Sequence, residues 1–229
     1  MIHTMKKNLP GRNRGGFTLV ELMVTIVIVS VLAALAFALS RKAIRNANSV
    51  KDMATMRQIF QTFPLYAADN NGFMPGPANT GVKATYGPQS TGRLSYYIAP
   101  YLGYENLERD DFLEAMSYSW QKSAASRDAP CAYLRETVPV GNEEEETYKP
   151  FGHPLRAGSD REPKKMSAVF SKVNIARTWI LSDLDQQHPD VGNPEWKSEI
   201  PVDMSHGNYR LAIFLDGHAG KLNKDNEPY

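Results

Sequence analysis

The strongest constraint on this chain is an apolar run near its N-terminus. From Phe17 to Leu39 there are 23 residues, and Glu21 is the only charged residue among them. At 1.5 Å per residue, a helix of this length spans a hydrocarbon core of about 30 Å. An unpaired charge in lipid costs at least about 2.5 kcal/mol, so we expect Glu21 to have a function and a partner.

A chain cleavage in front of the apolar run would supply that partner. If the bond between Gly16 and Phe17 is cut, a new α-amino group appears one helical turn from Glu21. This amino group can neutralise the Glu21 carboxylate of a neighbouring copy of the helix. Residues 1–16 carry four basic side chains and are interpreted as a targeting leader, which takes no part in the fold.

The segment around this bond resembles the processing site of type IV pilins and of the pseudopilins of type II secretion systems. It consists of Arg14-Gly15-Gly16-Phe17-Thr18-Leu19-Val20-Glu21-Leu22. The resemblance implies that a prepilin peptidase cuts after Gly16 and methylates Phe17 as the first mature residue. It also implies that Glu21 pairs with a neighbouring subunit's amino terminus during assembly. Each part of the motif lies at the spacing that this family has: the basic leader, the glycine, the phenylalanine, the offset glutamate and the apolar helix. An uncleaved signal anchor that carries a glutamate is the alternative.

The same resemblance implies a location and partners. It implies a single-pass protein of the inner membrane whose C-terminal head lies in the periplasm or outside, since the basic leader stays in the cytoplasm. The mature chain would form a homo-oligomeric filament with the help of a secretion or pilus assembly machinery. Three classes stay open: a subunit of a secretion pseudopilus, a pilus subunit whose head binds DNA, carbohydrate or a surface, and a membrane-anchored protein that does not polymerise.

Composition narrows the function classes of the mature chain. The whole chain has 26 basic and 25 acidic residues, but removal of residues 1–16 leaves 22 basic residues and a net charge of about −3. A mildly acidic chain gives no general case for nucleic-acid binding. Cys131 is the only cysteine, so an intramolecular disulfide cannot form, and we expect a buried free thiol.

The helix is expected to continue beyond the apolar run and to pack against a globular head. Apolar residues recur at helical spacing at Ala43, Ala47, Val50, Met53, Met56, Phe60 and Phe63. Pro64 is the expected end of the helix, because proline removes a backbone donor.

The predicted organisation of the whole chain has five parts. They are a leader (1–16), an assembly helix (17–39), an amphipathic helix (40–64), a loop-rich region (65–165) and a β-sheet region (166–229).

The final third of the chain has the alternating pattern of strands. Strands are predicted at 169–175, 179–181, 209–215 and 219–222. The pair Asp216-Gly217 predicts a hairpin between the last two strands, in a turn where both residues have positive φ. Strands that follow one long helix indicate an α+β fold, in which a small antiparallel sheet packs on the helix. The resemblance to pilins implies the same arrangement, in a ladle shape.

The middle of the chain gives weaker signals. Glycine and proline between residues 70 and 100 predict a long loop region with short ordered pieces. Residues 110–121 are predicted to form a short helix, capped by Asp110 or Asp111. The acidic run at 143–146 is predicted to be a solvated loop tip, with a site for a cation or a basic partner as the alternative.

His206 precedes Asp216-Gly217 by nine intervening residues. This spacing resembles the C-terminal H-X9-DG element of a pilin-like family. The interpretation we favour is structural: Asp216 and Gly217 make the turn, and His206 begins the preceding strand and hydrogen-bonds the loop backbone. A metal or ligand role is the alternative.

A cluster of carboxylates follows the strand predicted at 179–181. Asp183, Asp185 and Asp190, with His188 among them, provide oxygen ligands of the kind that calcium needs. Pseudopilins commonly bind calcium in a C-terminal loop, so the resemblance implies calcium as the one candidate cofactor. The segment lacks the glycine and the distal glutamate of an EF-hand loop, and an ordinary Asp-rich turn is the alternative.

The sequence gives no pattern of an active site. The histidines outside the leader are scattered, at positions 153, 188, 206 and 218. A Ser-His-Asp order, a nucleophile elbow, a P-loop and a His-Glu-x-x-His motif are all absent. We therefore predict that the protein is not an enzyme.

Overall fold

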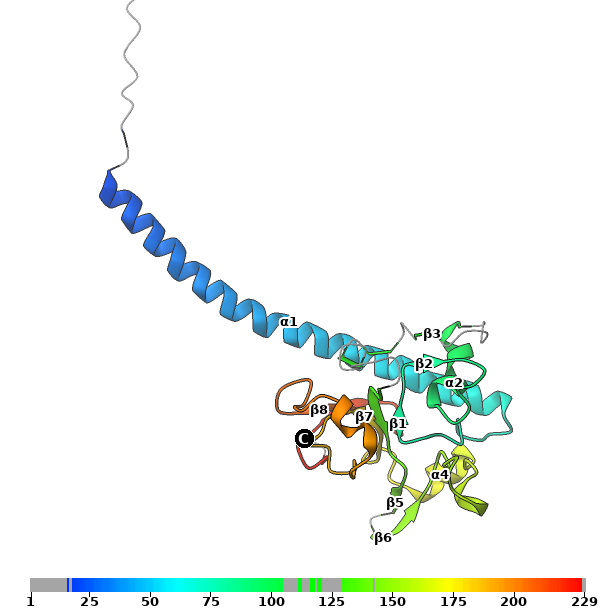
Figure 1. The fold of residues 1–229 in the computed structure, drawn as a ribbon. Helices are drawn as coiled ribbons and strands as arrows, with labels where there is room; N and C mark the ends of the chain where they lie inside the picture. The colour runs from blue at the N-terminus through cyan, green and yellow to red at the C-terminus, as the bar shows by residue number, and fades with distance from the viewer. Residues whose placement is uncertain are drawn as a thin grey trace, which may run out of the picture. The chain divides into compact units, whose positions relative to one another are not determined.

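The structure is a computed structural model of the chain. It describes residues 16, 18–104, 111–112, 116–117, 119–120, 129–141 and 143–227. The chain divides into two compact units, Met1–Ile44 and Arg45–Tyr229. The fold is α+β, as predicted, with a long N-terminal helix followed by shorter helices and a small antiparallel sheet (Figure 1).

The long helix α1 spans Leu19–Asp69. Its segment Leu19–Phe37, in the first unit, is long and apolar enough to cross a membrane, with a mean hydropathy of 2.6. None of this segment is buried within the structure. The prediction of a helix of membrane-spanning length is therefore confirmed.

Pro64 lies inside α1, and the prediction that it ends the helix is wrong. An internal proline removes one backbone hydrogen bond, but Pro64 is exposed and the residues after it are held by packing. Ala67 is buried, and the ring of Tyr66 packs edge-on against two other tyrosine rings. The helix ends at Asp69, and the amide of Gly72, which has a positive φ of 83°, donates to the Ala67 carbonyl.

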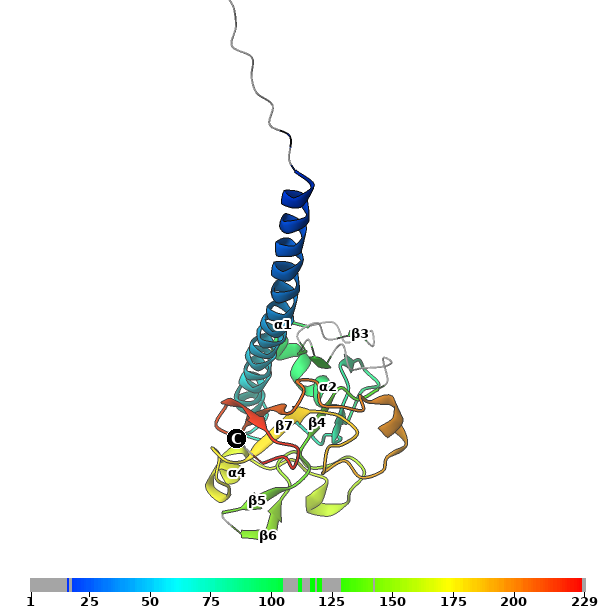
Figure 2. The same ribbon diagram turned by 90° about the vertical axis from the view of Figure 1, so that its left-hand side faces the viewer.

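The second unit contains a five-stranded sheet in the order β1-β4-β7-β8-β9, with every pair antiparallel (Figures 1 and 2). The strands are β1 (Gly81–Val82), β4 (Ala132–Leu134), β7 (Trp179–Asp183), β8 (Arg210–Phe214) and β9 (Ala219–Leu222). The three strands predicted from residue 179 onward are confirmed. Every residue of β7 and β8 is buried, because these central strands are covered on both faces.

The strand predicted at 169–175 is wrong, because α4 (Met166–Lys172) occupies most of it. Val169 and Val173 are four residues apart, a spacing that fits one turn of a helix as well as the same face of a strand. Val169 is fully buried, whereas Phe170 is 37% exposed, as expected when only one side of a short helix faces the core.

Two further predictions in the middle of the chain are wrong. The helix predicted at 110–121 is wrong at its start, where β3 (Asp111–Phe112) pairs with β2 (Thr85–Tyr86), whereas Ser119 and Trp120 are helical. Residues 110, 113–115, 118 and 121 of the predicted helix lie outside the described residues. The acidic run lies in β6 (Glu143–Tyr148) instead of in a loop tip. Glu143 pairs with Val140 and Thr147 pairs with Pro139 of β5 (Val138–Val140), and the register shifts between these two pairs.

The remaining short elements with bounds among the described residues are helices. They are α2 (Leu94–Ile98), η1 (Ala99–Leu102), η2 (Gly158–Asp160) and η3 (Glu195–Glu199). The region between residues 70 and 100 thus contains β1, β2, α2 and the start of η1, as the prediction of short ordered pieces required.

The core of the second unit lies between α1 and one face of the sheet. Met56, Ile59 and Phe63 of α1 are fully buried and belong to one cluster with Leu181 of β7 and Ile213 of β8. The predicted apolar stripe is therefore correct from Met53 onward. Ala43, Ala47 and Val50, which come earlier in the same periodic pattern, are exposed. A second cluster, which contains Trp179 and Phe214, includes the remaining buried apolar residues of the sheet.

The turn between β8 and β9 is the predicted hairpin, but only Gly217 has a positive φ, of 87°. The expectation that Asp216 has one too is wrong, because the turn has three residues and leaves only its last position left-handed. Asp216 Oδ1 instead accepts the amide of His218 at 3.0 Å. A Cβ at Gly217 would lie 2.9 Å from Phe60 of α1, so close approach also favours glycine.

Gly152 and Gly158 both have φ of 60°, which makes them a matched pair for a stability test. A Cβ at Gly152 would lie 2.2 Å from the Arg161 carbonyl oxygen, whereas a Cβ at Gly158 meets nothing within 4 Å. We expect Gly158→Ala to lower the free energy of unfolding by about 1–2 kcal/mol through backbone strain alone. We expect Gly152→Ala to lower it by about 3 kcal/mol or more. Urea denaturation measures both values, and equal losses would contradict the prediction.

Candidate functional site

Thr18 and Glu21 form a reciprocal cap at the start of α1. The Glu21 carboxylate oxygen Oε2 accepts hydrogen bonds from the Thr18 amide at 2.8 Å and from the Thr18 hydroxyl at 2.9 Å. The Glu21 amide in turn donates to Thr18 Oγ1 at 3.2 Å. This capping box satisfies amides that the first helical turn leaves without partners. Glu21 therefore has a local partner within a single chain, which the sequence analysis did not anticipate.

Gly16 lies in front of this cap. It is exposed, and a Cβ at this position would meet nothing within 4 Å. No contact with the described residues therefore requires a glycine at this position. Phe17 lies outside the described residues.

The side chains that follow Glu21 form a continuous apolar surface. Every large apolar side chain from Leu19 to Phe37 is more than half exposed. Exposed apolar surface of this extent marks a membrane or protein interaction site. The arrangement can therefore insert into lipid or pack against other copies of the helix.

Residues 11–37 match the family model of the prokaryotic N-terminal methylation motif. This chain carries a prepilin-type methylation motif. The matched residues include Gly16, Phe17, Glu21 and most of the apolar run, so the predicted resemblance at the N-terminus is confirmed. The motif ends well before residue 206, so the H-X9-DG resemblance stays a prediction. No curated protein and no solved structure matches the chain.

His206 lies between two buried carboxylates in the second unit. Its Nε2 is 3.4 Å from Oδ2 of Asp183 on β7 and 3.6 Å from Oδ2 of Asp52 on α1. Its ring stacks on that of Tyr209, with 5.5 Å between centroids. The expectation that His206 begins a strand and bonds the turn backbone is wrong, because β8 begins only at Arg210 and the carboxylates are the partners.

Each of the two carboxylates has further donors. Asp183 accepts the Trp120 indole N–H and the Leu211 amide, both at 2.8 Å, and Asp52 accepts the Ser119 hydroxyl. Burial raises the pKa of Asp183 to about 6, although the neighbouring His206 opposes the shift. The sequence signal that could have revealed Asp52 is its spacing, because an acidic residue four positions before Met56 lies on the core face of the helix.

Asp185 is paired with a buried cation. Arg210 is fully buried and donates from Nε to Asp185 Oδ2 at 2.6 Å and from Nη2 to Oδ1 at 2.8 Å. Its Nη1 donates to Asn226 Oδ1 at 2.9 Å. A buried carboxylate needs such a bidentate partner, since an uncompensated buried charge is strongly destabilising.

The predicted calcium ligands do not converge in the structure. Asp183 and Asp185 have the separate donors given above, and Asp190 Oδ2 accepts a hydrogen bond from the side-chain Nδ2 of Asn226 at 3.1 Å. In the part of the chain that the structure describes, no three His, Cys, Asp or Glu side chains are grouped to hold a metal. Calcium binding stays a prediction.

His188 is a buried neutral histidine. It is 2% exposed, its Nε2 lies 3.0 Å from the Ser182 hydroxyl, and its ring packs on Tyr133 with 4.6 Å between centroids. Burial, with smaller effects of the cations Arg210 and Arg135, lowers the pKa of His188 to about 3. This neutral ring packs against aromatic side chains and is part of the buried interior of the second unit.

Cys131 is the buried free thiol that the sequence predicts. Its side chain is 1% exposed and donates to the Val82 carbonyl at 3.3 Å. Burial raises the pKa of the thiol to about 12, so it is protonated at neutral pH. A nucleophilic role needs the thiolate, and this environment disfavours that form.

His188 makes the free energy of unfolding depend on pH. The pKa of its side chain is about 6.5 in the unfolded protein and about 3 in the folded protein. Its contribution to the free energy of unfolding is therefore complete above pH 6.5 and decreases as the pH falls toward 3. The loss approaches about 1.4 kcal/mol per pH unit. We expect His188→Asn, which keeps a polar partner for Ser182 but does not titrate, to flatten the dependence between pH 6.5 and 4.5. Urea denaturation at three pH values measures the slope.

Asp183 affects the pH dependence of the free energy of unfolding in the opposite direction, and it does so equally in both proteins of this test. Its folded pKa lies above the unfolded value of 3.8, so its contribution is lost as the pH rises through about 6. Asp183 is present in both proteins, and only the difference between their two curves reports on His188. Parallel curves for the wild type and His188→Asn would contradict the assignment.

Proposed function

We propose that this chain is the precursor of a pilin-like structural subunit, without enzymatic activity. In this proposal it is cleaved after Gly16, methylated at Phe17 and assembled through α1 into a type II secretion pseudopilus or a type IV pilus-like filament. The observation that carries the proposal is the methylation motif at residues 11–37, on a helix whose apolar side chains are exposed.

The chemistry of assembly follows from the first turn of α1. Cleavage creates an amino group at Phe17 and keeps the apolar helix attached to the head. When copies pack side by side, the exposed apolar side chains are buried against one another, and the Glu21 carboxylate needs a cation. All three capping bonds involve Thr18, and the two that the carboxylate accepts use Oε2. We assign Oε1 to the amino terminus of the neighbouring copy, which fixes the register between subunits.

The proposed location also follows from charge. Four basic side chains precede the apolar segment in residues 1–16, and Glu21 is the only charge within it. By the positive-inside rule, the leader stays in the cytoplasm, where a prepilin peptidase acts on it, and the second unit is carried across the inner membrane. A secretion or pilus assembly machinery would then extract the mature subunit into a filament.

The processing step can be tested with Gly16→Ala. We expect the wild-type protein, extracted from membranes, to start at Phe17 with one additional methyl group, and the variant to keep its leader. An alanine at residue 16 meets nothing within 4 Å, so loss of cleavage reports recognition and not misfolding. Intact mass and N-terminal sequencing give the result. A start at Met1 in both proteins would leave a plain signal anchor and reject the proposal.

The assembly role of Glu21 can be separated from its capping role. Glutamine can replace glutamate in a capping box but carries no charge. We expect Glu21→Ala and Glu21→Gln to be processed normally, and both to lower the amount of subunit in sheared filaments at least tenfold, because leaving one partner of a buried ion pair alone costs about 3 kcal/mol or more. Immunoblots of the filament fraction measure this.

Comparison of the two variants distinguishes the charge of Glu21 from its cap. Normal assembly of Glu21→Gln together with failure of Glu21→Ala would mean that the cap, and not the charge, is what assembly needs. Normal assembly of Glu21→Ala would refute any role of this residue in the filament. Thr18→Ala, which removes the capping hydroxyl but keeps the carboxylate, is the matched control and is expected to assemble.

A further inference from the structure

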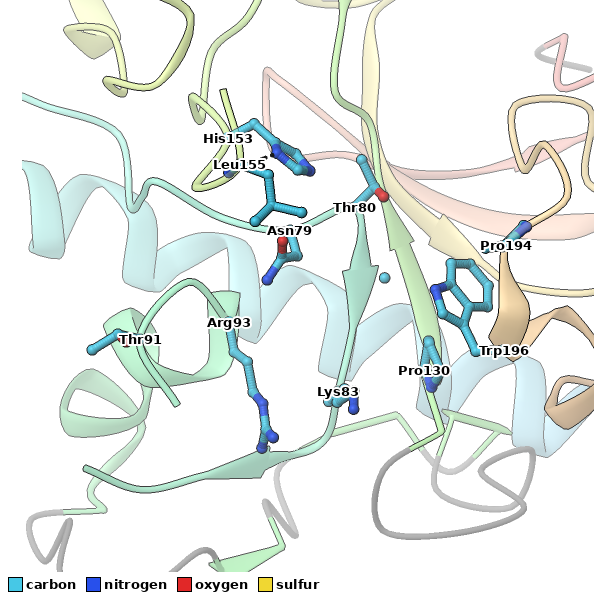
Figure 3. A pocket seen from close by; sticks show the side chains of 11 residues that line it. Asn79, Thr80, Lys83, Thr91, Arg93, Pro130, His153, Leu155, Pro194 and Trp196 are labelled. Carbon is cyan, nitrogen blue, oxygen red and sulfur yellow. Dashed lines mark hydrogen bonds between the residues drawn. The ribbon is translucent and has the colours of Figure 1, made fainter. Parts of the chain in front are cut away.

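An open hollow of about 400 Å³ lies beside β1, at one edge of the five-stranded sheet (Figure 3). Trp196 and Pro194 wall one side of it, and Leu155 and His153 lie on the other. A second hollow of about 270 Å³ adjoins it, and the two share Thr80, Pro194 and Trp196. The first hollow alone is within the range of about 300–1,000 Å³ that is usual for small-molecule sites. The described residues that line the two hollows all belong to the second unit.

The indole of Trp196 is held against the sheet where the two hollows meet. It packs on the second apolar cluster and is only half-buried. A Cβ at Gly81 of β1 would lie 3.4 Å from Cζ2 of Trp196 and 3.1 Å from Cγ of Pro130. The backbone of Gly81 does not have a positive φ, so close approach, and not conformation, favours glycine here. The strand therefore accepts the indole closely and leaves the rest of its apolar surface open to a ligand.

The charged side chains of the first hollow already have partners within the chain. Arg93 donates from Nη1 to the Thr85 hydroxyl at 2.6 Å, and Lys83 also interacts within the chain. His153 is a neutral donor, because its Nδ1 accepts the Leu155 amide at 3.3 Å and burial lowers its pKa. The neutral ring then carries its proton on Nε2. The first hollow therefore requires no charge of either sign on a ligand.

The carboxylates of the second hollow also have partners. Glu136 Oε1 lies 3.1 Å from Nη2 of Arg156, and Asp190 Oδ2 accepts a hydrogen bond from Nδ2 of Asn226 at 3.1 Å. An anionic ligand would be repelled by the two carboxylates, and a cationic ligand would have to compete with these donors. A neutral ligand avoids both costs.

Uncharged polar side chains provide the hydrogen-bonding groups of the two hollows. Asn79 lines the first hollow, Asn193 lines the second, and Thr80 lines both. These three side chains make no hydrogen bond with any residue in the part of the chain that the structure describes. Amide and hydroxyl side chains both donate and accept hydrogen bonds. They therefore suit a ligand whose own groups also do both, as the hydroxyl groups of a sugar do.

We propose that the two hollows joined by Trp196 bind a neutral oligosaccharide. One sugar ring packs its apolar C–H face on the indole, and the hydroxyl groups of this ring and its neighbours bond to Asn79, Thr80 and Asn193. A proline-rich peptide is the other ligand that an aromatic wall can bind. It fits less well, because proline has no N–H to donate and leaves the acceptor groups of these side chains unpaired.

This inference goes beyond the proposed filament role, because binding is a property of the head and requires neither cleavage nor assembly. The probes are cellohexaose, chitohexaose and maltohexaose, three neutral hexasaccharides that differ in linkage and substituents. They are added to the full chain in a detergent without a sugar headgroup, since an alkyl glycoside would compete for the site. A hyaluronan hexasaccharide is the anionic comparison and decaproline the peptide comparison.

Calorimetry measures the affinity of each probe. We expect saturable binding of at least one neutral hexasaccharide, and at least tenfold weaker binding of both comparison ligands. We also expect the affinity for the neutral sugar to be the same in about 50 and 500 mM salt, because salt screens only interactions between charges.

Tryptophan fluorescence locates the ligand. The chain has three tryptophans, and Trp120 and Trp179 are only 1% and 2% exposed. Protection from acrylamide quenching on binding therefore reports chiefly on Trp196. Absence of such protection while calorimetry shows binding would place the sugar elsewhere and overturn the proposal.

Substitutions in the hollows test the two kinds of contact. We expect Trp196→Ala to weaken binding about tenfold, and Thr80→Val, which removes a hydroxyl and keeps the shape, to weaken it severalfold. Phe170→Ala and Thr55→Val remove an aromatic ring and a hydroxyl outside both hollows and are the matched controls. Circular dichroism shows whether each variant folds. If Trp196→Ala does not fold, Thr80→Val and Asn193→Ala decide the question.

Several outcomes would each overturn the proposal. They are no saturable binding of any neutral hexasaccharide, binding of either comparison ligand within tenfold of the neutral sugar, an affinity that falls as salt rises, and unchanged binding by the folded variants of the hollows. Binding by the uncleaved Gly16→Ala chain is expected to equal that of the wild type, so failure of processing and failure of sugar binding are distinguishable.

Discussion

The second unit depends on the placement of two buried carboxylates against one imidazole. Asp52 of α1 and Asp183 of β7 are almost completely buried, and both lie within 4 Å of His206 Nε2. Apolar contacts such as those of Met56 and Phe63 are not directional, so they allow a helix to slide along a sheet. A buried carboxylate without its partners is costly, and only one register of α1 brings Asp52 to His206. This polar link therefore fixes which turn of the helix begins the head.

The position of α1 along the sheet also explains where the apolar stripe of α1 is no longer covered by the rest of the second unit. Val50 is 64% exposed although it belongs to the same periodic pattern as Met56. Periodicity shows which face of a helix is apolar, but it does not show how far along that face another element reaches. Residues before the polar link keep exposed apolar side chains. The position of Asp52 in the sequence therefore sets how much of the helix the sheet covers.

Local patterns predicted the parts of the structure that local physics decides. The methylation motif, the long helix, the hairpin at Asp216-Gly217 and the buried Cys131 were all predicted correctly. The errors came where tertiary contacts override a local preference. Pro64 is tolerated because Tyr66 and Ala67 are held by packing, and the acidic run lies in a strand because Glu143, at its start, and Thr147, just after it, pair with β5. The partners of His206 could not be found from sequence, since Asp52 is more than 150 positions away and no short motif joins them.

The carboxylates after β7 show why composition alone is a poor guide to a binding site. Asp183, Asp185 and Asp190 alternate in the sequence as calcium ligands would, yet each accepts hydrogen bonds from a different donor. Buried ion pairs and metal sites use the same acidic side chains, so only the positions of the donors in three dimensions distinguish them.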